Sequence, residues 1–116
     1  MQYMTTYKFG DVILVPFPFT DQSTSKKRPA IVISSDNYNQ SKPDIILIAV
    51  TSQVNATLQF GEALINDWAG ARLLKSSMIK PIMTTVQRNL VIRTLGKLQS
   101  QDFQDLENIL QQIIDM

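Results

Sequence analysis

The sequence predicts a mainly β protein, a small barrel of roughly five short strands closed by one C-terminal helix. Short apolar runs recur along the chain, and Pro, Asn, Asp or Gly residues bound them. Near the C-terminus the apolar residues change to helical spacing. With 116 residues the chain can bury one modest core, so we expect a single domain over residues 1–116.

The first half of the chain predicts three strands and one helical turn. The strands are expected over residues 11–17, 30–34 and 44–51. Ser35 and Asp36 are typical of a helix start, so a helical turn is expected from there through Gln40. Pro43 stops this turn, because a proline disfavours helical geometry in the residue before it.

The second half predicts further strands and the closing helix. The strands are expected over residues 62–65, 77–86 and 90–98. Pro81 indicates an edge position or a bulge in the second of these strands. Gly96 indicates an interruption or a bulge in the third.

The final helix is expected to begin with Ser100 as its cap. Asp102 then lies in the first turn, where a carboxylate suits the positive end of the helix dipole. Apolar residues follow at helical spacing, at Phe103, Leu106, Ile109, Leu110 and Ile113. We expect this stripe to pack in the core or in a dimer interface, not to bind a cofactor.

Two missing residue types exclude several kinds of site. The chain contains no Cys and no His, which excludes disulfides, a thiolate nucleophile, a Cys-based zinc site and a Ser-His-Asp triad. The acidic residues before residue 100 are isolated from one another, which disfavours a metal-dependent nuclease. We therefore expect no metal and no cofactor.

No segment predicts insertion in a membrane or secretion. The longest apolar run, residues 45–50, is strand-sized and far below the roughly 20 residues of a membrane span. The N-terminal segment lacks the basic and apolar regions of a secretion signal. We therefore expect a cytoplasmic protein with no membrane partner.

The net charge of +1 conceals an asymmetry along the chain. After Ser100 every charged residue is acidic, so residues 1–99 hold 11 basic and 6 acidic residues, a net charge of +5. A basic body favours polyanionic ligands. Scattered surface lysines are the simpler explanation, but Lys26, Lys27 and Arg28 stand together before Pro29 and favour a binding site.

The segment from Gly10 to Ser34 is the most informative part of the chain. It consists of Gly-Asp, an apolar strand, an aromatic-Pro turn, a polar loop, Arg28-Pro29-Ala30 and a second apolar strand. Because Pro29 favours extended geometry in the residue before it, Arg28 is expected on a rigid, extended backbone. A guanidinium placed in this way suits a phosphate group.

In order and spacing, this segment resembles the MazF/PemK family of bacterial toxins, the endoribonucleases of type II toxin–antitoxin systems. A second block also fits, because the apolar run 45–50 ends in Thr51-Ser52-Gln53, and residues 73–98 match more loosely. The resemblance implies an SH3-like barrel of the plasmid-maintenance toxin type. It also implies metal-independent, sequence-specific cleavage of single-stranded RNA in the bacterial cytoplasm.

The resemblance assigns roles to individual residues. Arg28 and Thr51 match the family's catalytic arginine and threonine, which act while the 2′-hydroxyl attacks the neighbouring phosphorus. Further RNA contacts are expected from Phe19, Lys26, Lys27, Ser52, Gln53, Lys75 and Ser77. Better-known relatives have an acidic residue and a Gln in the block that begins at Lys75, and an Asp where this chain has Pro18. The cleavage sequence is therefore not implied.

The resemblance also implies two protein partners. One is a second copy of the chain, with the RNA groove running across the homodimer. The other is a cognate antitoxin, whose acidic C-terminal segment would lie in that basic groove.

Two alternatives remain at this point. The same barrel serves toxins that poison DNA gyrase through a C-terminal segment that includes a tryptophan. This chain's only tryptophan, Trp68, is internal, which disfavours that function. The second alternative is a catalytically silent barrel that binds nucleic acid without cutting it.

Overall fold

Six strands and two α-helices form the described part of the chain. The structure is a computed structural model that describes residues 6–17 and 26–115. Its elements are β1 (Asp11–Phe17), β2 (Lys26–Val32), α1 (Asp36–Ser41), β3 (Asp44–Thr51), β4 (Ala63–Ile65), β5 (Ser77–Gln87), a 3₁₀ turn (Arg88–Leu90), β6 (Arg93–Lys97) and α2 (Ser100–Ile113). No helix in these ranges is long and apolar enough to cross a membrane.

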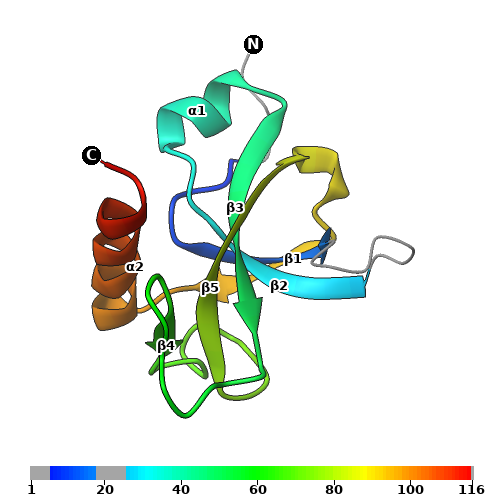
Figure 1. Ribbon diagram of the computed structural model, residues 1–116. Coiled ribbons are helices and arrows are strands. Elements are labelled where there is room, and N and C mark those ends of the chain that lie inside the picture. The colour runs from blue at the N-terminus through cyan, green and yellow to red at the C-terminus, as the bar shows by residue number, and fades with distance from the viewer. Residues whose placement is uncertain (1–5, 18–25, 116) are drawn as a thin grey trace.

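The strands form one antiparallel sheet in the order β4-β5-β3-β2-β1-β6. Figure 1 shows that the sheet curls into a half-barrel, with α2 along one side and α1 at one end. The segment after β4 returns to the β6 edge, where Gly96 allows a close approach. A Cβ at Gly96 would lie 2.6 Å from the Ala71 carbonyl oxygen, so this position has no room for a side chain.

The predicted strands 11–17 and 44–51 are confirmed as β1 and β3. The second predicted strand has the wrong bounds, because β2 begins at Lys26 and ends at Val32. Lys26 pairs with Phe17 and Lys27 with Pro16, so the hairpin with β1 extends the strand over residues expected in a loop. The predicted helical turn is confirmed as α1, and the Ser35 hydroxyl accepts the Tyr38 N–H at 3.2 Å.

The predicted irregularities in the later strands are confirmed. In β5, Lys80 pairs with Ala49 and Met83 with Ile48, so two residues that include Pro81 form a bulge. In β6, Gly96 pairs with Val12 but Thr94 with Ile13, which leaves a second bulge beside Gly96. The expectation of a strand from residue 90 is wrong, because a 3₁₀ turn ends at Leu90 before β6 starts.

The start of α2 differs from the expectation by one residue. Gln99 is the N-cap and makes no side-chain cap hydrogen bond, whereas Ser100 is the first helical residue. Asp102 lies in the first turn as expected, but it is only 2% exposed. Its carboxylate accepts the backbone N–H groups of Asn66 at 2.9 Å and Asp67 at 2.8 Å. Asp102 therefore joins α2 to the turn after β4.

The core lies on both faces of the curled sheet. On one face, Val12 and Ile31 pack with the buried apolar residues of α2, which are Leu106, Ile109 and Leu110. On the other face, the next residues along the strands form a second cluster that includes Ile13, Val32, Ile45 and Leu47. Burial on both faces explains why the strands read as nearly continuous apolar runs. The apolar stripe of α2 packs in the core of its own chain.

Candidate functional site

A hollow of about 630 Å³ opens beside the sheet, and we call it the basic hollow. Strands β1, β2, β3, β5 and β6 and the segment after β4 line it. Its basic residues are Lys27, Arg28, Arg72, Lys75, Lys80 and Arg93. No acidic side chain from the described part of the chain lines it. The charge of this cavity therefore favours an anion with several charges.

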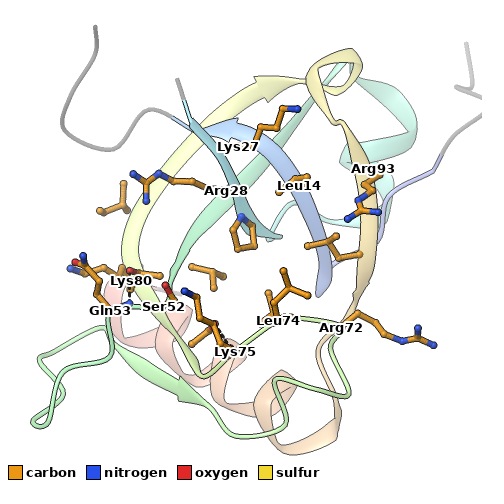
Figure 2. Close-up of a pocket in the computed structure, with 17 residues that line it drawn as sticks. Leu14, Lys27, Arg28, Ser52, Gln53, Arg72, Leu74, Lys75, Lys80 and Arg93 are labelled. Carbon is orange, nitrogen blue, oxygen red and sulfur yellow. Dashed lines mark hydrogen bonds between the residues drawn. The ribbon is translucent and has the colours of Figure 1, made fainter. Parts of the chain in front are cut away.

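The cations surround an apolar floor. Figure 2 shows Arg28, Gln53 and Lys80 on one side of the hollow, and Arg72 and Arg93 on the other. Leu14 and Leu74 lie between the two sides. Apolar surface flanked by separated positive charges suits a ligand that alternates flat rings with phosphates, as single-stranded nucleic acid does.

Arg28 lies within β2, where it pairs with Val15 of β1. Its backbone is therefore extended, as expected from Pro29 after it. Arg28 is half-buried, whereas Lys26 and Lys27 before it on the same strand are exposed. Pairing with β1 holds the backbone of this residue, so the guanidinium extends from an ordered strand.

Thr51 is the last residue of β3 and lines the same hollow. Its Oγ1 accepts the backbone N–H of Gln53 at 3.1 Å, which fixes the turn that leaves the strand. Because the oxygen accepts this bond, the hydroxyl hydrogen of Thr51 remains a donor for a ligand. Ser52 and Gln53 follow on the exposed turn and also line the hollow.

Lys75, in the segment before β5, and Ser77, the first residue of β5, both line the hollow. Lys75 is exposed, whereas Ser77 is 3% exposed. The Ser77 hydroxyl donates to the Lys75 carbonyl at 2.8 Å. Ser77 thus holds the backbone of Lys75 in place.

The structure does not bring two of the predicted RNA contacts to the basic hollow: one lies away from it and the other is outside the described residues. Lys26 is exposed on β2 and is not among the residues that line the basic hollow. Phe19 lies outside the described residues, as does Pro18.

Sequence reasoning missed three cations of the hollow. Lys80 interrupts the apolar run of β5 just before Pro81, and this interruption was a usable signal. Arg72 and Arg93 belong to no motif and reach the hollow only through the curl of the sheet. Within residues 6–17 and 26–115, no three or more Asp, Glu, His or Cys side chains gather as a metal site requires.

A scan against protein families matches residues 8–114 to the PemK-like, MazF-like toxins of type II toxin–antitoxin systems. The chain belongs to this family. The predicted resemblance to these toxins is therefore confirmed, in the later part of the chain as well as in the first half. A search of curated protein sequences gave no match.

Solved structures share the fold. An endoribonuclease from a mycobacterial species is 12% identical, covers 99% of this chain and 97% of its own, and has a TM-score of 0.75. A mycobacterial endoribonuclease in complex with its cognate antitoxin is 11% identical, with 97% of both chains covered and a TM-score of 0.73. MazF from Deinococcus radiodurans (Form-I) is 18% identical over 97% of this chain and 99% of that chain, with a TM-score of 0.72. These likenesses confirm the predicted toxin-type barrel with its C-terminal helix.

Proposed function

We propose that this toxin is a metal-independent, sequence-specific endoribonuclease that cleaves single-stranded RNA in the basic hollow. The main support is the lining itself, since six basic residues and no acidic residue of the described chain surround an apolar floor. Membership of the MazF-like toxin family also supports the proposal, as does the likeness of the fold to that of the two mycobacterial endoribonucleases.

In the proposed reaction the RNA supplies its own nucleophile. The 2′-oxygen forms a bond to the adjacent phosphorus and loses its proton to water. The bond from phosphorus to the 5′-oxygen breaks, and that oxygen takes up a proton from water. The products are a 2′,3′-cyclic phosphate and a 5′-hydroxyl. The protein needs only to position the RNA and stabilise charge on the phosphate.

Arg28 is the residue that we assign to charge stabilisation. An arginine guanidinium presents N–H groups in one plane, so it can bind two phosphate oxygens at once. Thr51 would donate its hydroxyl hydrogen to an oxygen of the same phosphate, since its oxygen already accepts the Gln53 N–H. Lys27, Lys75 and the 52–53 turn would bind neighbouring parts of the RNA.

The proposal includes the partners of the family. A cognate antitoxin would place an acidic segment in the basic hollow and exclude RNA by occupying it. One of the mycobacterial endoribonucleases that share this fold was solved in complex with its own antitoxin. If an antitoxin without its acidic segment inhibited cleavage equally well, exclusion from the hollow would be the wrong mechanism.

We also propose a homodimer in the bacterial cytoplasm. The exposed side chains of Leu90 and Ile92, 47% and 46% accessible, offer apolar surface for such an interface. Sedimentation at micromolar concentration tests this part, and a fully active monomer would contradict it.

The central experiment incubates the purified protein with a long RNA of defined sequence in EDTA. We expect cleavage at a short recurring sequence, with a cyclic phosphate on one product and a 5′-hydroxyl on the other. Binding without cleavage would favour the silent barrel. Cleavage only after magnesium is restored would contradict the metal-independent mechanism.

A further inference from the structure

Arg72 and Arg93, on one side of the basic hollow, also line a second cavity. This cavity of about 370 Å³ shares Leu73, Leu74 and Leu95 with the basic hollow, and we call it the side hollow. Both arginines are exposed. Because the two cavities have five lining residues in common, the surface available to a long ligand continues past these arginines.

The backbone of Arg72 is strained. Its φ of 67° lies in the left-handed region, which favours glycine. The N–H of Arg72 donates to the Ala69 carbonyl at 3.0 Å, and the N–H of Leu73 donates to the Trp68 carbonyl at 2.9 Å. These two bonds are those of a Schellman ending, in which Arg72 occupies the position that is usually glycine.

An arginine at this position gains little from burial. Its stem lies against β6, where a Cβ on Gly96 would be 2.7 Å from Arg72 Cγ. Figure 2 shows the guanidinium extending outward from the rim of the hollow. The packing of the stem does not account for the charged end of the side chain, and strained residues concentrate at functional sites, so the charge of Arg72 is the feature that needs an explanation.

The surface between the two hollows is apolar. Leu74 is 94% exposed, which is unusual for a leucine beside a cavity, and Leu95 is half-buried next to it in the lining. β6 places Arg93 at one edge of this surface, and Gly96 of the same strand supports the stem of Arg72.

We propose that Arg72 and Arg93 form a second phosphate-binding subsite for single-stranded RNA. The subsite rests on the proposed function and binds the RNA backbone on one flank of the phosphate at Arg28. Leu74 packs against the base of the nucleotide between the two positions. The left-handed backbone of Arg72 is strained because a cation stands at this point of the basic hollow, where a glycine would be relaxed.

The test measures binding of a single-stranded DNA oligonucleotide, which lacks the 2′-hydroxyl and cannot be cleaved by the proposed reaction. Affinity is measured by fluorescence anisotropy at several salt concentrations. Each lost phosphate contact lowers the salt-dependence slope by about 0.7 for single strands. We expect this decrease, with weaker binding, for Arg72→Gln and for Arg93→Gln.

Lys97→Gln is the matched control. Lys97 is exposed on the same strand as Arg93, and it lines neither hollow. The substitution removes one positive charge and is expected to leave the slope unchanged. If Arg93→Gln and Lys97→Gln lowered the slope equally, net charge would explain the effect and the subsite would be overturned. Wild-type slopes in both arginine variants would also overturn the subsite.

Arg72→Gly distinguishes a binding role from a structural one. Glycine relieves the left-handed strain, so we expect the melting temperature to rise by about 4 °C while affinity falls as in Arg72→Gln. A lower melting temperature would make Arg72 a structural residue and contradict the proposal.

Cleavage of RNA by the wild-type protein is measured in parallel. Oligonucleotide binding through the two arginines without RNA cleavage would leave the subsite standing and refute the proposed catalysis. Wild-type rates of RNA cleavage in both arginine variants would refute the subsite alone. If the wild-type protein neither bound the oligonucleotide nor cleaved RNA, both the subsite and the proposed function would be refuted.

Discussion

Two hollows of similar size in this molecule have opposite charge. The basic hollow contains six cations. Another hollow, of about 570 Å³, is lined by α1, α2 and residues just before β1 and just after β2, and its charged residues are Asp36 and Glu107. We call it the acidic hollow. No basic side chain from the described residues lines it, and its floor includes Phe9, Ile33 and Leu110.

The comparison shows that the positions of the charges decide which ligand a surface favours more than the net charge of the chain does. A net charge of +1 would not predict that a small protein binds a polyanion. The fold concentrates cations in one cavity and leaves acids at the other. The ion pair of Lys8 with Asp36, at 3.7 Å and with both side chains exposed, alters this little because it is screened by solvent.

Removing the central cation of the basic hollow should have the largest effect. Arg28→Ala is expected to lower kcat by roughly 10²–10³-fold, or about 3–4 kcal/mol, because the charge on the phosphate loses its stabilisation. Arg28→Lys should restore only part of the rate, since an ammonium cannot form the two-point contact. A cleavage time course on one oligonucleotide measures both.

Lys26→Ala is the matched control on the same strand, and it should leave kcat unchanged because Lys26 lies outside the hollow. Circular dichroism melts show whether each variant is folded. Near-wild-type cleavage by Arg28→Ala would end its catalytic assignment.

Asp102→Ala should lower the free energy of unfolding by about 3 kcal/mol, since two backbone N–H groups lose a buried, charged acceptor. Asp105→Ala on the same helix should cost under about 0.5 kcal/mol, because its hydrogen bond partner is an exposed glutamine. Denaturant titration measures both. A similar loss in the two variants would show that Asp102 has no special part in joining α2 to the turn.

Thr51→Val should slow cleavage by about fivefold, equivalent to about 1 kcal/mol for one neutral hydrogen bond. Valine keeps the shape of the side chain but cannot accept the Gln53 N–H. A fall in melting temperature of several degrees would therefore attribute the slower cleavage to a displaced 51–53 turn and not to a lost contact with the phosphate.

The stability of the fold should depend on pH through Asp11, whose carboxyl lies near Asp36 of the acidic hollow. Burial raises the pKa of the Asp11 carboxyl; the Lys8 N–H and its ammonium oppose this, and Asp36 adds to it. A raised pKa stabilises the fold below the unfolded value, near about 4, and this stabilisation is lost as the pH rises through the folded pKa. The stability of wild type relative to Asp11→Asn should therefore fall as the pH rises from about 4. A constant difference between about pH 3 and 7 would contradict the shift.

Glu107→Gln should have the smallest effect, because Glu107 faces the acidic hollow. We expect unchanged RNA affinity, whereas Lys75→Gln should lower the salt-dependence slope by about 0.7. If Glu107→Gln strengthened binding as much as Lys75→Gln weakened it, net charge alone would explain binding.

Local signals explain the parts of the fold that could be predicted. The bounds of β1 and β3 follow from apolar runs between Gly, Pro and Asp residues, and the bulge at Pro81 follows from its missing N–H. The start of β2 could not be predicted in this way. Lys26 has no preference for strands, and only its pairing with Phe17 extends the element.

The same division applies to the candidate site. Arg28 and Thr51 stand in motifs whose order along the chain is recognisable, and the structure brings both to one cavity. Arg72 and Arg93 come from separate segments without a pattern, and only the approach of the post-β4 segment to Gly96 brings them together. Residues that are brought together only by the tertiary fold form no local sequence pattern from which their proximity could be predicted.

The segment between β4 and β5 is anchored at three points. At its start, Asn66 and Asp67 donate their backbone N–H groups to the Asp102 carboxylate. In the middle, the Ala71 carbonyl packs closely against Gly96, and at the end the Ser77 hydroxyl donates to the Lys75 carbonyl. Between Ala71 and Ser77, the exposed side chains of Leu74 and Lys75 line the basic hollow and contribute little to the core. Under the proposed function, exchanging these two residues as a pair would change the RNA-contacting surface while the barrel stays the same.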